Sequence, residues 1–150
     1  MKLTSPAFRN DGTIPSKYTC DGENISPELN IEAPPSETKT FALIMEDPDV
    51  PRSIRSDGMW DHWIVWNIPK GTRKIPEGTN PQGVLGKNTR GNTNYGGPCP
   101  PDREHRYFFK LFALDTSLNL PGGSTKQELL KVIQNHIIEK VELIGKYKRK

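Results

Sequence analysis

The placement of proline and glycine constrains this chain more than any other feature of its 150 residues. The chain has 14 prolines and 13 glycines, and both residue types interrupt helices and strands. Four long stretches contain neither: residues 36–47, 59–68, 102–120 and 124–144. Regular secondary structure is therefore expected there, with turns and loops between.

Three of these stretches predict strands. Residues 41–45 are apolar at every position, which is typical of a central strand covered on both faces. In the second stretch, alternation places on one face Trp60, His62, Ile64 and Trp66, and on the other Trp63 and Val65. In the third it groups His105, Tyr107, Phe109, Leu111 and Ala113, opposite Arg106, Phe108, Lys110 and Phe112.

The fourth stretch predicts a helix and then a last strand. Residues 124–127 read as a capping box, and helical spacing relates Leu129, Val132, Ile133 and either His136 or Ile137. Beyond them, alternation resumes at Val141, Leu143 and Tyr147. We therefore expect one domain over residues 1–150, all-β and antiparallel with peripheral helices.

The positive charge is concentrated in a tail. The formal net charge is +3, and four of the 21 Lys and Arg residues lie within residues 146–150. The other 17 basic residues face 18 acidic ones, so the rest of the chain is nearly neutral. Because no aromatic residues are interleaved with a basic patch, a nucleic-acid partner is not expected.

Location and cysteine chemistry follow from simple counts. The first residues lack an apolar signal-peptide region, and no window approaches 18 apolar residues, so neither secretion nor integral membrane association is expected. We predict a cytoplasmic protein.

The two cysteines, Cys20 and Cys99, are too few for a disulfide scaffold and lack the spacing of a zinc motif. Two reduced thiols are the favoured interpretation, and a single bridge is the alternative.

Two loop segments concentrate chemistry-bearing residues. The segment Asp-Pro-Asp-Val-Pro at 47–51 follows the first central strand, and the Gly- and Pro-rich residues 96–101 lead into His105. If the strands that carry residues 47 and 62 are antiparallel, both positions lie at one rim of the sheet. Carboxylates, two imidazoles and a phenol would meet there.

Such a group suits a small anion. A carboxylate orients a neighbouring imidazole and favours its charged form, and glycine N–H groups can cradle an anion. Each motif alone is more often structural, since Asp-Pro-Asp is an ordinary turn and Gly-Gly-Pro marks a loop. Their co-occurrence favours a site.

These segments resemble the phosphatidylethanolamine-binding protein (PEBP) family, within it the bacterial and archaeal Raf-kinase-inhibitor-like branch. The similarity also covers residues 18–22, 26–29, 112–115 and 143–147. It implies a β-sandwich with a rim pocket for anionic head groups such as phosphate. The implied ligand-binding residues are Asp47, Asp49, Trp60, His62, Tyr95, Gly97, Pro100, Pro101, His105 and Tyr107.

The resemblance also implies individual roles. His62 and His105 would contact the anion, Asp47 would orient a ring, and Tyr107 would donate or pack at the mouth. Arg106 points to the opposite face by alternation, so we expect it to bond loop carbonyls or a carboxylate. Asp61 stands where animal members carry a further His, which would add negative charge near the pocket. The sequence ends soon after residue 147, without the final helix of animal members, so a more open pocket is expected.

We therefore predict a non-enzymatic anion-binding protein without a cofactor, which could regulate a partner protein. The alternative is a serine protease or kinase inhibitor that acts through exposed loops at residues 52–58 or 76–91. Metal-dependent catalysis through the Asp and His residues, and nucleophilic catalysis by Cys99 near His105, are weaker alternatives. The resemblance also implies a homodimer. The candidate exposed aromatics are Phe8, Tyr18 and Trp63, with a place in the core as the alternative for each.

Overall fold

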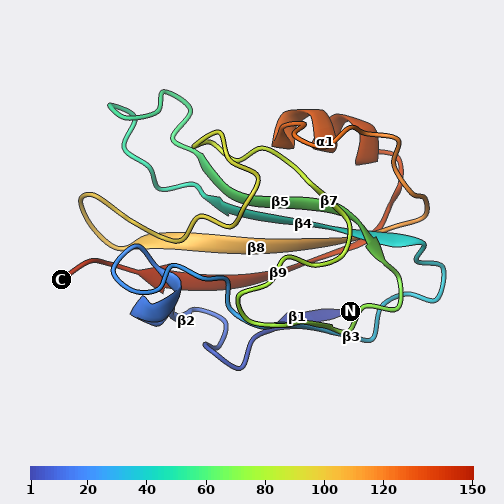
Figure 1. Ribbon diagram of the computed structural model, residues 1–150, viewed down its shortest axis with the longest axis horizontal. Helices are drawn as coiled ribbons and strands as arrows, with labels where there is room; N and C mark the ends of the chain where they lie inside the picture. Colours follow the sequence, from blue (N-terminus) through green and yellow to red (C-terminus); the bar gives the residue numbers. More distant parts are fainter.

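The computed structural model describes residues 1–150 and arranges the strands in two sheets (Figure 1). The large sheet comprises, in spatial order, β2 (Gly12–Thr13), β9 (Ile137–Tyr147), β8 (His105–Leu114), β4 (Thr40–Asp47), β5 (Trp60–Pro69) and β7 (Val84–Leu85). The small sheet comprises β1 (Lys2–Thr4), β3 (Leu29–Glu32) and β6 (Lys74–Ile75). Neighbouring strands are antiparallel except β2 and β9. The predicted all-β sandwich is confirmed.

Two apolar cores cover the two faces of the large sheet. One lies between the sheets and takes Phe41, Leu43 and Met45 from β4; the other lies under helix α1 and takes Ala42 and Ile44. Every residue of β4 is buried, as its continuous apolar run predicted. Figure 1 shows α1 and the small sheet on opposite sides of the large sheet.

The strand β5 carries a bulge close to the rim. Met45 pairs with Trp63 and Glu46 pairs with Asp61, so His62 is an extra residue without a partner on β4. Because a bulge adds one residue to one strand, alternation is reset on either side of it.

The predicted common face of β5 is therefore wrong. Ile64 and Trp66 pack in the core under α1, whereas Trp60 and His62 line a cavity on the other side of the sheet. A pattern read with a strict period of two cannot register the inserted residue.

The helix begins one residue later than its predicted cap. Thr125 is the N-cap of α1 (Lys126–Ile133), and its hydroxyl accepts from the Glu128 N–H while the Glu128 carboxylate accepts from the Thr125 N–H. This is a capping box, shifted from residues 124–127 because Glu128 supplies the charged partner. The helix is too short to cross a membrane, and the structure contains no other α-helix.

The helix also ends earlier than predicted. Leu129 and Ile133 are buried, but Val132 is exposed and lies outside the core under the helix. Ile137 begins β9, where it pairs with Leu114. Pairing with the neighbouring strand takes precedence over the helical spacing at this point, and the predicted last strand extends over 11 residues.

Two further predictions are wrong. Phe8, Tyr18 and Trp63 are buried in the core between the sheets, so they are not exposed aromatics. For Cys20 and Cys99 the favoured interpretation, two reduced thiols, is wrong, and the structure has the alternative: they form a disulfide, with a Cα–Cα distance of 5.5 Å. Their separation of 79 residues gave no sign of this contact, which arises where the segment after the 3-10 helix η1 (Ser16–Tyr18) packs on the Gly- and Pro-rich loop.

Candidate functional site

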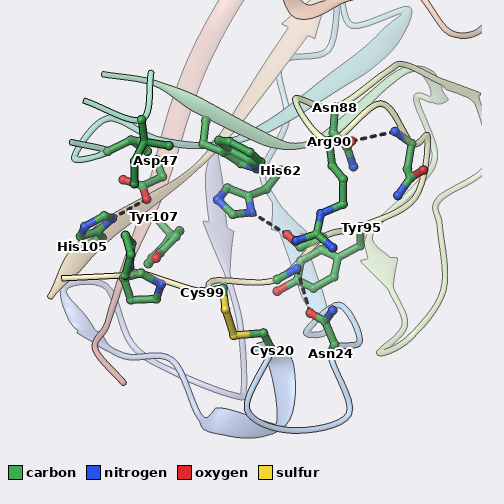
Figure 2. Close-up of a pocket in the computed structure, with 18 residues that line it drawn as sticks. Cys20, Asn24, Asp47, His62, Asn88, Arg90, Tyr95, Cys99, His105 and Tyr107 are labelled. Atoms are coloured by element: carbon green, nitrogen blue, oxygen red, sulfur yellow. Dashed lines mark hydrogen bonds and ion pairs between the residues drawn. A yellow bond between two sulfur atoms is a disulfide. The ribbon is translucent and has the colours of Figure 1, made fainter. Parts of the chain in front are cut away.

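A cavity of about 370 Å³ opens at the rim where β4 ends and where β5 and β8 begin (Figure 2). Nine of the ten predicted ligand-binding residues line it: Asp47, Trp60, His62, Tyr95, Gly97, Pro100, Pro101, His105 and Tyr107. The antiparallel pairing of β4 with both β5 and β8 brings these positions together. Their part in ligand binding stays a prediction.

The tenth residue, Asp49, lies outside the cavity lining. Its carboxylate accepts from the Nε and Nη2 atoms of Arg106 at 2.9 and 2.8 Å, and from the Arg106 backbone N–H. These hydrogen bonds hold the pKa of Asp49 below its usual value. The expectation that Arg106 bonds a carboxylate is confirmed, and this pair ties the loop after β4 to the start of β8.

His105 is held between two carboxylates. Its Nδ1 lies 2.6 Å from Asp47 Oδ2, and its Nε2 lies 2.7 Å from Asp102 Oδ1. The ring is fully buried and both of its nitrogens contact carboxylates, so neither nitrogen is free for a ligand. Burial raises the pKa of Asp47, whereas the hydrogen bond from His105 lowers the pKa of Asp102.

This clamp changes the expected role of His105. Asp47 orients the ring as predicted, but direct contact between His105 and an anion would require Asp102 to move away. Asp102 was not among the predicted site residues; its position three residues before a strand-initial His was the available signal.

His62 presents the opposite situation. Its Nδ1 lies 2.6 Å from the Gly96 carbonyl oxygen, which can only accept, so Nδ1 carries the proton. Its Nε2 is buried and has no partner. Burial lowers the pKa of His62 to about 4 and outweighs the hydrogen bond to the Gly96 carbonyl, which raises it; the nearby Arg90 acts in the same direction as burial. At neutral pH the ring is uncharged, and Nε2 is a hydrogen-bond acceptor.

The Tyr107 hydroxyl is a second polar group without a partner. It is buried, and burial raises the pKa of Tyr107, so the hydroxyl keeps its proton. The His62 and Tyr107 rings meet edge to face with centroids 5.4 Å apart. The cavity therefore contains one unused acceptor and one unused hydroxyl.

The positive charge of the cavity comes from Arg90. This residue is exposed, lines the cavity and forms no ion pair (Figure 2). Its loop is held by Asn88, whose side chain donates to the Asn94 carbonyl and accepts from the Asn92 N–H, both at 2.9 Å. Arg90 was not among the predicted site residues, because residues 76–91 were predicted only as a possible inhibitory loop.

The segment after η1 forms the floor of the site. The Tyr95 hydroxyl donates to the Tyr18 carbonyl at 2.8 Å, and the Gly97 N–H donates to Asn24 Oδ1 at 2.9 Å. A Cβ at Gly97 would lie 2.4 Å from the Tyr18 carbonyl oxygen, so only glycine fits this contact. The Gly96 N–H donates to the His62 carbonyl. Both glycine N–H groups are thus used within the protein, and the expected glycine cradle for an anion is absent.

Comparison with known proteins identifies the family. The family model described as phosphatidylethanolamine-binding protein matches residues 4–148. The chain belongs to the PEBP family. A UPF0098 protein of Chlamydia pneumoniae is 49% identical over 149 residues, and one of Methanothermobacter thermautotrophicus is 45% identical over 155 residues; each alignment covers 99% of both chains.

Solved PEBP structures share the fold. The crystal structure of a putative PEBP homologue from Chlamydia trachomatis superposes with a TM-score of 0.96 at 47% identity, covering 99% of this chain and 97% of the other. The structure of E. coli YbcL, described as a new member of the mammalian PEBP family, gives 0.89 at 30% identity, with 99% and 98% covered.

Asp61 does not add negative charge to the PEBP pocket, contrary to expectation. It faces α1, where its Oδ1 lies 2.7 Å from Lys126 Nζ. Lys126 also contacts Glu46, which is bonded to Lys110. Because these four residues compensate one another's charge, none is available to a ligand in the cavity.

Two weaker catalytic alternatives gain no support from the geometry. No group of three or more His, Cys, Asp or Glu side chains is arranged to hold a metal ion. Cys99 is bonded to Cys20 and has no thiol, so its proposed role as a nucleophile is wrong.

Proposed function

We propose that this PEBP-family protein is a non-enzymatic binding protein whose rim cavity takes a small anionic or phosphorylated ligand. One observation carries the proposal. The unpaired Arg90 side chain reaches a cavity in which His62 Nε2 and the Tyr107 hydroxyl are buried without partners. A buried unsatisfied polar group costs about 1–3 kcal/mol, so two of them beside a free cation favour a ligand that pairs with all three.

The ligand would be recognised by charge and by hydrogen bonds together. Arg90 would supply the positive charge, because both nitrogens of His105 are engaged by Asp47 and Asp102. The Tyr107 hydroxyl would donate to an anionic oxygen. The stiff wall of Pro100 and Pro101 would enclose the ligand with little rearrangement. These features support a phosphate group, which the family's lipid head group also contains.

An NMR titration tests this proposal. Inorganic phosphate and O-phosphoethanolamine are added to ¹⁵N-labelled protein up to millimolar concentration while the imidazole signals of His62 and His105 are followed. We expect saturable shifts at His62 and smaller ones at His105, and at least tenfold weaker binding in Arg90→Ala. Arg73→Ala is the matched control, because Arg73 is exposed and lies outside the cavity lining. Unmoved imidazole signals would rule out the anion pocket.

A loop at the cavity edge supports inhibition of a serine protease or a kinase as the second candidate. The Ile54 side chain is 53% exposed and lines the cavity edge. Its loop is closed by hydrogen bonds from the Ile54 N–H to the Pro51 carbonyl and from Arg52 Nη1 to the Ser56 carbonyl. A rigid loop with an exposed apolar tip suits insertion into a protease cleft. Assays against panels of serine proteases and kinases, with Ile54→Asp as control, test it; no dose-dependent inhibition would count against it.

The proposed partners also include a second copy of the chain, in a cytoplasmic setting. The exposed Leu130, Val132 and Ile137 around α1 and the start of β9 support a surface for another protomer. Sedimentation velocity at a protein concentration of about 100 µM tests the homodimer. This concentration is about tenfold above a dimer dissociation constant of ~10 µM, so a monomer under these conditions would contradict the proposal.

The cytoplasmic location is tested by cell fractionation, because disulfides are more typical of oxidising compartments.

A further inference from the structure

We propose that the cavity selects an anion that brings a proton donor of its own, as the monoanion of a phosphate monoester does, over anions that lack one, such as sulfate and phosphodiesters. The inference rests on the anion-binding function proposed above and specifies its ligand. It follows from the hydrogen-bonding state of His62.

The Gly96 carbonyl fixes the tautomer of His62. A carbonyl oxygen 2.6 Å from Nδ1 requires a proton on that nitrogen. In a neutral ring the remaining nitrogen then carries a lone pair and no proton. His62 Nε2 therefore cannot donate to an anion, and two lone pairs would face each other if a fully ionised oxygen came next to it.

The groups around His62 do not supply the missing proton. The polar, charged and aromatic residues that line the cavity with it include Asp47 of β4, Trp60 of β5, His105 and Tyr107 of β8, and Asn88, Arg90 and Tyr95 of the intervening loop. Burial and the neighbouring Arg90 disfavour a positive charge on the ring. Asp47 is occupied by His105 and by the Asp49 N–H at 2.7 Å. The charged residues of the opposite face, such as Lys126, contact carboxylates there and not the ring.

The charge and the hydrogen-bonding needs of these three groups therefore define the kind of ligand that fits the cavity. Arg90 requires negative charge, the Tyr107 hydroxyl can donate to an anionic oxygen, and His62 Nε2 requires a donor. A phosphate monoester with one P–OH group meets all three needs. A phosphodiester of the same charge lacks the O–H, and sulfate is fully ionised.

The cost of the missing proton sets the size of the selectivity. At pH 7, protonating a ring whose pKa is about 4 reduces affinity by a factor of about 1,000. Protonating a phosphate monoester, whose second pKa is about 6, reduces it only about tenfold. With otherwise equal contacts, the monoester should bind about 100-fold more tightly than sulfate at pH 7.

Calorimetry on the full chain with methyl phosphate, dimethyl phosphate and sulfate tests the proposal. Titrations at pH 7 in buffers of different ionisation enthalpy count the protons taken up on binding. We expect methyl phosphate to take up nearly one proton, and sulfate to bind about 100-fold more weakly and to gain about tenfold per unit of pH decrease towards pH 5. Dimethyl phosphate, which matches the charge of the methyl phosphate monoanion, should also bind weakly.

The outcomes separate the two proposals. Binding of sulfate or dimethyl phosphate as tight as that of methyl phosphate, without proton uptake, would overturn the selectivity but leave the anion pocket standing. Absence of binding by all three ligands would overturn the pocket itself. His62→Phe should abolish the selectivity while leaving Arg90 in place. If this variant does not fold, the ¹⁵N shift of His62 Nε2 in the wild type answers the same question: methyl phosphate should move it towards the hydrogen-bonded range, and no movement on saturation would contradict the proposal.

Discussion

The two faces of the sheet rim treat their buried polar residues in opposite ways. Glu46 and Asp61 face α1, whereas the adjacent residues Asp47 and His62 face the cavity. On the α1 side the buried carboxylates lie beside lysines: Asp61 Oδ1 accepts no hydrogen bond but is 2.7 Å from Lys126 Nζ, so its charge is compensated. On the cavity side two polar groups, His62 Nε2 and the Tyr107 hydroxyl, have no partner. The difference indicates that one face contributes to stability while the other keeps hydrogen-bonding capacity for a ligand.

The pKa shifts express this contrast. Burial raises the pKa of Glu46, but Lys110 and Lys126 outweigh that effect and the pKa is lowered overall. Burial lowers the pKa of Lys126, yet Asp61 and Glu46 outweigh it and the pKa is raised. For His62 the hydrogen bond to the Gly96 carbonyl raises the pKa, but burial outweighs it and the pKa is lowered overall.

The largest expected loss of stability comes from removing the lysine that compensates the buried carboxylates under α1. Lys126→Met removes the cation that contacts Glu46 at 3.2 Å and Asp61 at 2.7 Å, leaving buried carboxylates without it. We expect a loss of about 3–5 kcal/mol in the free energy of unfolding, measured by chemical denaturation. Lys131→Met, on the exposed side of the same helix, should change it by less than about 0.5 kcal/mol. Equal losses in the two variants would contradict the role of the buried charges.

Opening the disulfide weakens the cavity side instead. Replacing Cys20 and Cys99 by Ala should cost about 2–4 kcal/mol, because a bridge between residues 79 apart restricts the unfolded chain. It should also weaken binding of inorganic phosphate, since the segment after η1 forms the floor of the cavity. Denaturation with and without dithiothreitol checks this prediction. Wild type should become as unstable as the variant in reductant, and an unchanged midpoint would contradict it.

Mild acid should destabilise the protein through His62. The folded pKa of about 4 lies below the unfolded value of 6.5, so between these values the unfolded chain binds more protons. The stability is complete above pH 6.5 and declines as the pH falls towards 4. Between pH 7 and pH 5 the loss should be about 2 kcal/mol, and His62→Gln should remove most of this dependence. A wild-type stability that is flat over this range would contradict a neutral buried His62.

The smallest expected change in stability comes from removing a buried hydroxyl, and its sign depends on whether that hydroxyl has a hydrogen-bond partner. Tyr107→Phe deletes a buried hydroxyl without a partner, so it should stabilise the protein by about 1 kcal/mol while weakening phosphate binding. Tyr95→Phe is the matched variant in the same cavity, because its hydroxyl donates to the Tyr18 carbonyl at 2.8 Å. It should destabilise by about 1 kcal/mol. The same sign for both variants in thermal denaturation would remove the distinction between satisfied and unsatisfied hydroxyls.

Much of the fold could be predicted from local patterns. The continuous apolar run of β4 and the alternation of β8 identify the central strands because burial dictates both patterns. The bulge at His62 could not be predicted, since it depends on pairing with β4. The end of α1 was missed for a similar reason: pairing of Ile137 with Leu114 overrides the helical spacing.

The candidate site shows the same division. The segments around Asp47, His62 and His105 were recognisable from composition and order, so the position of the cavity was predictable. The hydrogen-bonding state of each group depends on residues distant in sequence. Asp102 on His105, Lys126 on Asp61, and the disulfide under the floor all come from tertiary contacts that no spacing reveals.

The hydrogen-bonding state of His62 is the most direct test of the contrast between the two faces. Long-range ¹H–¹⁵N correlation spectra of the ligand-free protein report the protonation of each ring nitrogen. We predict a protonated Nδ1 and an unprotonated Nε2 at pH 7, with the ring gaining its second proton only near pH 4. A ring that is already charged at pH 7, or one protonated at Nε2 instead of Nδ1, would contradict the account.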